Sequence, residues 1–193
     1  MDRQTVLAEF KAANALLEGH FILTSGRRSA TYMQCARVLL DPKRAERLIA
    51  VLNKSLESLP GNIILAPAMG GIIVGYELAR QRGCQSLFVE RVDGQFELRR
   101  GFELTASDEI IIAEDVITTG LSTRECISLC QSFGATVTAV ACLIDRTDGN
   151  HGIDVPLISL AKLSIPTYAA DAIPPELAAI PPVKPGSRKL TNR

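Results

Sequence analysis

The sequence predicts an α/β protein in which helices flank a central parallel sheet. Short apolar runs, each bounded by glycine, proline or polar residues, alternate with amphipathic segments of helical period from about residue 60 onwards. Strands separated by helices imply crossover connections, and crossover connections join parallel strands. The chain has 193 residues, of which 47% are hydrophobic, so it is long enough and apolar enough for one domain with a sizeable core.

The first 60 residues are less regular. Apolar residues at helical spacing predict a helix over residues 3–18. The next segment, GHFILTSGRRSATYMQC, alternates on both sides of Ser25-Gly26, which predicts a short hairpin. Asp41-Pro42 combines a helix-capping residue with a proline suited to the first turn, so a second helix is expected to begin there and run to about Ser58.

The regular part of the chain follows. Glycines close both of its predicted helices, over residues 70–83 and 121–134. Apolar runs predict strands over residues 62–68, 86–90, 109–115, 135–145 and 156–163. The remaining residues are rich in proline and basic side chains, and we expect them to be extended over the surface or frayed.

Composition argues against several classes of function. Lys plus Arg and Asp plus Glu both number 21, and this zero net charge gives no general attraction to nucleic acid. We see no secretory signal and no run of about 18 apolar residues, so no membrane association is expected. The five cysteines lack a CxxC pair and predict reduced thiols in the cytoplasm. Cys126 and Cys130 share a helix face, which favours buried thiols over the alternative, a metal pair.

The most informative stretch is residues 110–123, IIIAEDVITTGLST. Glu114 and Asp115 come directly after an apolar strand, and ligands bind beyond the carboxyl ends of the strands in open parallel sheets. The next loop leads into a helix, whose free N–H groups and dipole attract phosphate. Its residues are Val116, Ile117, Thr118, Thr119, Gly120, Leu121 and Ser122. The loop would hold a phosphate and the two acids would hold vicinal hydroxyls, as a ribose 5-phosphate requires.

A simpler interpretation is an ordinary turn in which Ser122 caps the helix and the two acids are merely solvated. A buried strand rarely ends in two acids without a partner, which weakens that interpretation. Known phosphate motifs do not match. The loop has no Gly-Lys-Ser/Thr, and Gly70, Gly71 and Gly75 do not fit the dinucleotide pattern G-x-G-x-x-G.

Residues 110–123 resemble the diphosphoribosyl-binding signature of type I phosphoribosyltransferases. Over roughly residues 15–190 the chain resembles the shorter bacterial and archaeal orotate phosphoribosyltransferases, in the segments GHFILTSGRRSATYMQC, LAPAMGGIIVGYELA, FVERVDGQFELRRGF, ACLIDRTDG and VKPGSR. The resemblance implies the type I phosphoribosyltransferase fold in a single domain, residues 1–193. A small hood with the base site would occupy about residues 1–40, the α/β core about 41–165, and an extended tail about 166–193.

The activity implied by the resemblance is transfer of ribose 5-phosphate from 5-phosphoribosyl 1-diphosphate to orotate. The products would be orotidine 5′-phosphate and diphosphate, in the biosynthesis of UMP. Mg²⁺ would be the cofactor, held by the diphosphate and not directly by side chains. The family also implies a homodimer, in which a mobile loop of one subunit reaches the active site of the other.

The resemblance also implies roles for individual residues. Glu114 and Asp115 would bind the ribose hydroxyls, the residues from Thr118 to Ser122 would bind the 5-phosphate, and the whole segment 114–122 would bind the donor. Thr118 and Arg146 would contact orotate, and Arg91 would contact the diphosphate. Catalysis would therefore rest on Glu114, Asp115 and Arg91. Arg99 and Arg100 would belong to the mobile loop, residues 92–100, although two exposed arginines on a hairpin are an alternative.

The chain departs from the longer enzymes of this family at three lysine positions. The loop RVDGQFELRRG contains neither lysine nor histidine, Thr24 stands before Ser25-Gly26, and Met69-Gly70 follows the Pro-Ala dipeptide. Our hypothesis is that Arg91, Arg99 and Arg100 supply the charge stabilisation. Arginine does not act as a general acid at neutral pH, so the chemistry would depend on positioning, Mg²⁺ and electrostatics.

Two other functions remain open from the sequence. The first is a phosphoribosyltransferase for another base, such as a purine, against which the orotate-like segments argue. The second is a non-catalytic protein of the same fold that senses nucleotides, for which the missing lysines are the best support.

Overall fold

The computed structural model describes residues 2–23 and 25–185. Its elements in chain order are α1 (Arg3–Ala12), β1 (Leu16–Ile22), β2 (Arg28–Met33), α2 (Cys35–Val38), α3 (Pro42–Ser55), β3 (Ile63–Pro67), α4 (Gly71–Arg82), β4 (Gln85–Val92), β5 (Gln95–Leu98), β6 (Glu109–Ile117), α5 (Leu121–Ser132), β7 (Thr136–Asp145), β8 (Leu157–Lys162), β9 (Thr167–Tyr168) and α6 (Pro175–Ala178). No helix among these residues is both long and apolar enough to span a membrane.

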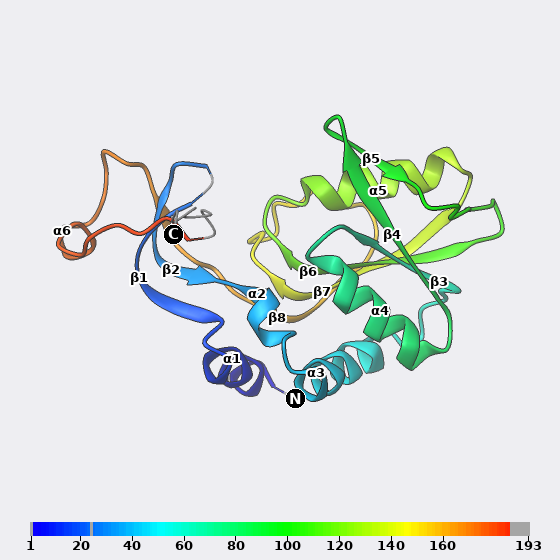
Figure 1. The fold of residues 1–193 in the computed structure, drawn as a ribbon, viewed down its shortest axis with the longest axis horizontal. Coiled ribbons are helices and arrows are strands. Elements are labelled where there is room, and N and C mark those ends of the chain that lie inside the picture. The colour runs from blue at the N-terminus through cyan, green and yellow to red at the C-terminus, as the bar shows by residue number, and fades with distance from the viewer. Residues whose placement is uncertain (1, 24, 186–193) are drawn as a thin grey trace, which may run out of the picture.

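A six-stranded sheet with the order β5-β4-β3-β6-β7-β8 forms the centre of the molecule (Figure 1). The strands β4, β3, β6, β7 and β8 are parallel to their neighbours, whereas the edge strand β5 pairs antiparallel with β4. The predicted α/β class with a mostly parallel sheet is therefore confirmed. The β4–β5 hairpin makes the sheet mixed, because the run after residue 90 continues as a strand and turns back at Asp93-Gly94.

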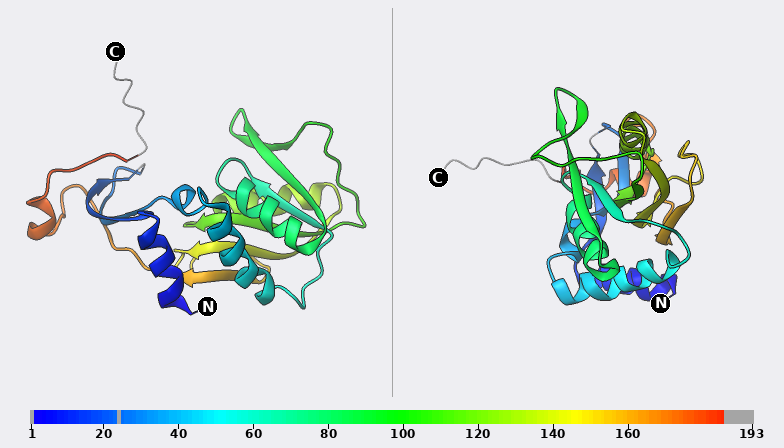
Figure 2. Two further views of the ribbon diagram at one scale, coloured as in Figure 1. Left: turned by 60° about the horizontal axis from the view of Figure 1, so that its bottom comes forward. Right: turned by 90° about the vertical axis from the view of Figure 1, so that its right-hand side faces the viewer.

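Two hydrophobic clusters cover the two faces of this sheet. On β6, Ile111 packs in the cluster that holds α1, α3 and α4, and Ile110 and Ile112 pack in the cluster that holds α5. Successive side chains of a strand point to opposite faces, so an unbroken apolar run fits a strand that is buried on both sides. The end-on view in Figure 2 shows α3 and α5 on opposite sides of the sheet.

A second, three-stranded antiparallel sheet, β1-β2-β9, lies at one end of the molecule (Figure 1). We call this sheet the hood. Both ends of the chain build it: β9 pairs with β2 at Ser29 and Thr167, and Val183 exchanges backbone hydrogen bonds with His20 and Ile22. The hairpin predicted around Ser25-Gly26 is present as β1–β2, closed by a hydrogen bond from the Leu23 N–H to the carbonyl of Arg27.

The predicted helix over residues 3–18 was wrong at its C-terminal end. The helix stops at Ala12, and Asn14 adopts a left-handed conformation with φ of 49°. Asparagine tolerates this conformation better than most residues, so the turn was compatible with the sequence. Leu16 and Leu17, which fitted the helical spacing, instead begin β1 opposite Met33 and Tyr32.

Other element boundaries moved by a few residues. The helix from Asp41 ends at Ser55 and not at Ser58, and β6 continues past Asp115 to Ile117. The tail was expected to be extended or frayed, but its described part contains β9 and α6. Thr24 and the residues Gly186, Ser187 and Arg188 of the motif VKPGSR lie outside the described residues.

Candidate active site

Two acids lie near the carboxyl end of β6, two and three residues before its last residue, Ile117. Glu114 is 8% exposed, Asp115 is partly buried, and neither forms an ion pair with a described residue. Burial, and then the charge of Asp115, raise the pKa of Glu114 to about 8. Burial also raises the pKa of Asp115, and the Val116 N–H, which donates to its Oδ1 at 2.8 Å, opposes that rise. The pair is thus a desolvated acidic centre that gains from hydroxyl donors or a developing positive charge.

Glycines bring the loop after β3 against this acidic centre. A Cβ on Gly70 would lie 2.6 Å from Oδ1 of Asp115, and a Cβ on Gly71 would lie 2.5 Å from the carbonyl oxygen of Ala113. At Gly71 the close atom belongs to the backbone, so only glycine fits there, whereas a side chain at Gly70 would displace the Asp115 carboxylate. The ends of β3 and β6 therefore converge, as expected for neighbouring parallel strands.

A small cavity of about 50 Å³ lies at the N-terminus of α5, lined by Glu114 and residues 116–123. Gly120 is the N-cap, with φ of 72°, and no side chain caps the helix. The interpretation in which Ser122 caps the helix beside solvated acids is therefore wrong, because the helix begins at Leu121 and Glu114 is buried. Uncapped N–H groups and hydroxyls facing a small polar cavity suit a phosphate.

Arg124 fixes the shape of this loop. Its Nη1 donates to the carbonyl of Thr119 at 2.9 Å and also to the carbonyl of His151. A Cβ on Gly120 would lie 2.5 Å from that His151 oxygen. The loop that lines the small cavity is thus packed against the segment that follows β7. That segment begins with Arg146.

A second cavity, of about 420 Å³, adjoins the first and shares Thr118 and Thr119 with it. The other lining residues come from the hood, the C-terminal segment and the end of β7: Ile22, Leu23, Ser25, Arg27, Tyr32, Arg146, Thr167 and Pro185. Arg146 is held there by its backbone N–H, which donates to Ile117 at 2.8 Å. Its Nε is buried without a partner, and burial lowers the pKa of its guanidinium. We call this cavity the base cavity.

The hairpin arginines lie outside both cavities. Arg91, on β4, forms an ion pair with Glu125 at 2.5 Å and stacks on Phe96. Arg99 and Arg100 follow β5 and are exposed, and Arg100 pairs with Glu90 at 2.8 Å. This arrangement matches the alternative of exposed arginines on a hairpin. Arg99 and Arg100 nevertheless lie in residues 92–100, the segment expected to be the mobile loop.

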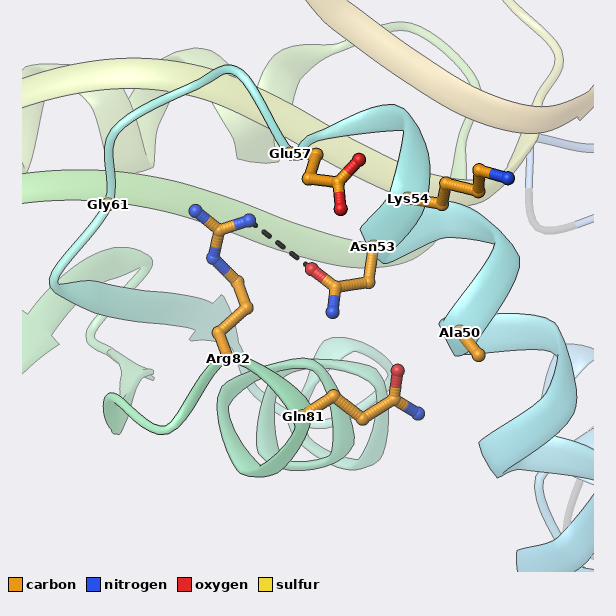
Figure 3. A pocket seen from close by; sticks show the side chains of 7 residues that line it. All are labelled: Ala50, Asn53, Lys54, Glu57, Gly61, Gln81 and Arg82. Carbon is orange, nitrogen blue, oxygen red and sulfur yellow. Dashed lines mark hydrogen bonds between the residues drawn. The ribbon is translucent and has the colours of Figure 1, made fainter.

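Other polar candidates have structural roles. Cys126 and Cys130 are buried free thiols, and no group of three or more metal-ligating side chains occurs in the described part of the chain. His20 is buried, with Nδ1 2.9 Å from the carbonyl oxygen of Ile180. A cavity of about 580 Å³ between the ends of α3 and α4 is lined by Arg82 and Asn53, among others, far along α4 from the acids (Figure 3).

Sequence reasoning missed Arg27, Thr167 and Arg124. Arg27 could have been found, because it lies beside the turn of the hairpin segment that resembles the orotate site, and an arginine there is a candidate anion contact. Thr167 and Arg124 carried none, because their importance depends on contacts with residues 140 and 27 positions away.

Comparison with known proteins agrees with this geometry. An orotate phosphoribosyltransferase of Maricaulis maris is 54% identical over 193 residues, which cover 98% of this chain and 100% of the relative. The chain belongs to the orotate phosphoribosyltransferase family. Another member, from Methylorubrum extorquens, is 52% identical with 98% of each chain covered. No protein-family model matches the sequence.

Solved structures place this family member among type I phosphoribosyltransferases. The orotate phosphoribosyltransferase of Aeropyrum pernix superposes with a TM-score of 0.71 at 25% identity, covering 82% of this chain and 93% of that one. An adenine phosphoribosyltransferase of Thermoanaerobacter pseudethanolicus has a TM-score of 0.62 at 24% identity, covering 69% of this chain and 88% of that one. The fold is therefore shared by enzymes for different bases, and the base preference must be argued from the base cavity.

Proposed function

We propose that this protein is an orotate phosphoribosyltransferase, which transfers ribose 5-phosphate from phosphoribosyl diphosphate to orotate. One observation carries the proposal: a phosphate-sized cavity and a cationic base cavity meet at Thr118 and Thr119, beside the buried pair Glu114 and Asp115. This arrangement accommodates the three parts of orotidine 5′-phosphate in order, with phosphate at α5, ribose at the acids and base under the hood.

The residues of the two cavities have different roles in binding and catalysis. The N–H groups and hydroxyls from Thr118 to Ser122 hold the 5-phosphate. Glu114 and Asp115 accept hydrogen bonds from the ribose hydroxyls, and their charge stabilises the cation-like ribosyl group of the transition state. The guanidinium of Arg146 pairs with the anionic base, and Thr118 orients both ligands because it lines both cavities.

Mg²⁺ is the cofactor of this proposal. The residues present fit a metal carried by the substrate, since the described residues offer two adjacent carboxylates and no three-ligand cluster. Bound to the diphosphate, Mg²⁺ would neutralise the charge of the leaving group. The protein's own part is to orient the donor and keep its C1 atom beside the acids.

The hairpin arginines are proposed to meet the diphosphate after the β4–β5 hairpin moves. Their pairs with Glu125 and Glu90 are exposed, so breaking them costs little. Glutamine substitutions at Arg91, Arg99 and Arg100 that leave kcat unchanged would exclude this role.

We further propose a homodimer and a cytoplasmic location. Exposed apolar residues on α4 support the dimer, and five free thiols support a reducing compartment.

The test follows the ultraviolet absorbance of orotate with protein, Mg²⁺ and phosphoribosyl diphosphate. Turnover is expected with orotate and not with adenine or uracil, and Asp115→Asn should abolish most of it. Turnover with adenine alone would favour the other-base alternative. Tight binding of phosphoribosyl diphosphate without turnover of any base would favour the nucleotide sensor.

A further inference from the structure

The base cavity contains a second guanidinium group besides that of Arg146. Arg27 lies in the turn just before β2 and lines the cavity. Its Nε donates to Oγ1 of Thr167 at 2.8 Å, and its Nη2 donates to the carbonyl of the same residue at 2.6 Å. Nη1 makes no hydrogen bond with any described residue. One side of this guanidinium is thus fixed by the protein, and donors remain for a ligand.

Charge in the base cavity is one-sided. Its described lining contains two arginines, hydroxyl residues and apolar residues, and no aspartate or glutamate. Arg146 makes no side-chain hydrogen bond with a described residue, and its Nε is buried. Arg27 is exposed, and the charge of Asp148, which does not line the cavity, acts on Arg146. An anion in the base cavity would therefore gain charge-assisted hydrogen bonds from two guanidinium groups and meet no carboxylate in the described lining. The ring of Tyr32 adds a flat wall to the same cavity.

The side chain of Arg27 reaches the base cavity from the turn between β1 and β2. An arginine held on one edge offers a planar, fixed donor pair, which matches a carboxylate better than a flexible ammonium does.

We propose that Arg27 is a second anion contact in the base cavity and sets its preference for a planar pyrimidine carboxylate over an uncharged pyrimidine. Thr167 is a positioning residue that holds the Arg27 guanidinium in place from the C-terminal segment. This inference rests on the proposed function, because it names the ligand chemistry of the same cavity.

Steady-state kinetics of Arg27→Gln test the inference. We expect the KM for orotate to rise roughly 10- to 100-fold, as for loss of a hydrogen bond to a charged group. The KM for phosphoribosyl diphosphate should stay within about twofold, because Arg27 does not line the phosphate-sized cavity. Arg27→Lys should restore part of the orotate affinity. Thr167→Val should raise the same KM by a smaller factor, since it removes only one of the two bonds that hold the guanidinium.

Arg37→Gln is the matched control, because Arg37 is exposed and donates to Asn14 away from the base cavity. It should leave both KM values unchanged. An orotate KM for Arg27→Gln within twofold of wild type would overturn the inference, as would equal rises in both KM values.

Failure of the proposed function can be distinguished from failure of the inference about Arg27. If the wild type does not turn over orotate, calorimetric titration of orotate and uracil into wild type and Arg27→Gln decides the matter. Orotate binding that weakens at least about tenfold in the variant, with uracil unaffected, supports the role of Arg27. No difference between the two proteins, or no orotate binding by the wild type, overturns it.

Discussion

At the scale of single residues, the acid pair shows how burial and chemistry are linked. Glu114 continues an apolar strand, so the sheet that positions it also removes it from water. The fold therefore holds a carboxyl group in an unfavourable environment until a ligand arrives. Such desolvated groups concentrate at functional sites. Their burial strengthens the interaction with a bound ligand but lowers the stability of the folded protein.

Glu114→Gln should stabilise the ligand-free protein in a pH-dependent manner. The pKa of Glu114 is raised from its ordinary value of 4.5 to about 8, so between these values the unfolded chain releases a proton that the folded chain keeps. The free energy of unfolding of the wild type should therefore fall, relative to the variant, as pH rises from about 4.5 to 8, and the gap should stay constant above. Urea denaturation across this range measures it.

The exposed Glu176→Gln serves as the control and should show no such trend. A stability difference between Glu114→Gln and wild type that is flat across the pH range would contradict the burial of that carboxyl group.

At the scale of elements, the sequence predicted what depends on local pattern. The glycine-closed helices and the apolar strands were found within a few residues, because period and breaker residues determine them locally. The helix end at Ala12 and strand β9 were not found. Leu16 fits a helix and a strand equally well, and a two-residue strand exists only through its pairing with Ser29.

Arg82 illustrates an element-level contact that belongs to stability and not to the site. From the end of α4 it donates to Oδ1 of Asn53 at 3.2 Å (Figure 3). It also donates to the carbonyls of Leu56 and Leu59 at 3.3 and 2.9 Å. It thus ties the end of α4 to the turn that follows α3, where the Leu56 carbonyl also accepts from the Leu59 N–H at 2.9 Å. The helix rises about 1.5 Å per residue, which puts Arg82 roughly 16 Å from Gly71.

We expect Arg82→Met to lower the free energy of unfolding by about 1–3 kcal/mol and to leave both KM values unchanged. Chemical denaturation and steady-state kinetics provide the two readouts. Arg80→Met removes the ion pairs that the half-exposed Arg80 forms with Glu77 and Glu46, and should cost at most about 1 kcal/mol. Equal losses in the two variants would show that the carbonyl contacts of Arg82 are energetically unimportant.

At the scale of the whole molecule, the sequence predicted the convergence of the strand ends but not the origin of the hood. Parallel strands bring Gly70, Asp115 and Arg146 to one edge by topology alone, so their neighbourhood followed from the fold class. The hood was expected from the first 40 residues, whereas its third strand comes from the last 30. No local pattern specifies such a long-range pairing.

The proposed dimer has a specific surface to test. Met69, Ile73 and Tyr76 are 83%, 49% and 64% exposed and share one side of the start of α4. Tyr76→Glu should shift the protein towards monomers in sedimentation velocity experiments over a range of concentrations, because it places a charge in an apolar contact. Phe133→Glu, at an exposed apolar site at the end of α5, should leave the sedimentation unchanged. A wild type that is monomeric throughout would refute the dimer.

The pairing of both chain ends in the hood has a consequence for protein synthesis. Strands β3 to β8 lie in one continuous stretch of sequence, so the nascent chain has all of the phosphate-sized cavity before its last 30 residues leave the ribosome. The base cavity needs Thr167 to meet Arg27 across 140 residues. Contacts between distant residues form late in folding. An unfinished chain therefore gains the phosphate-sized cavity first, and it gains the base cavity last, when residue 167 has left the ribosome.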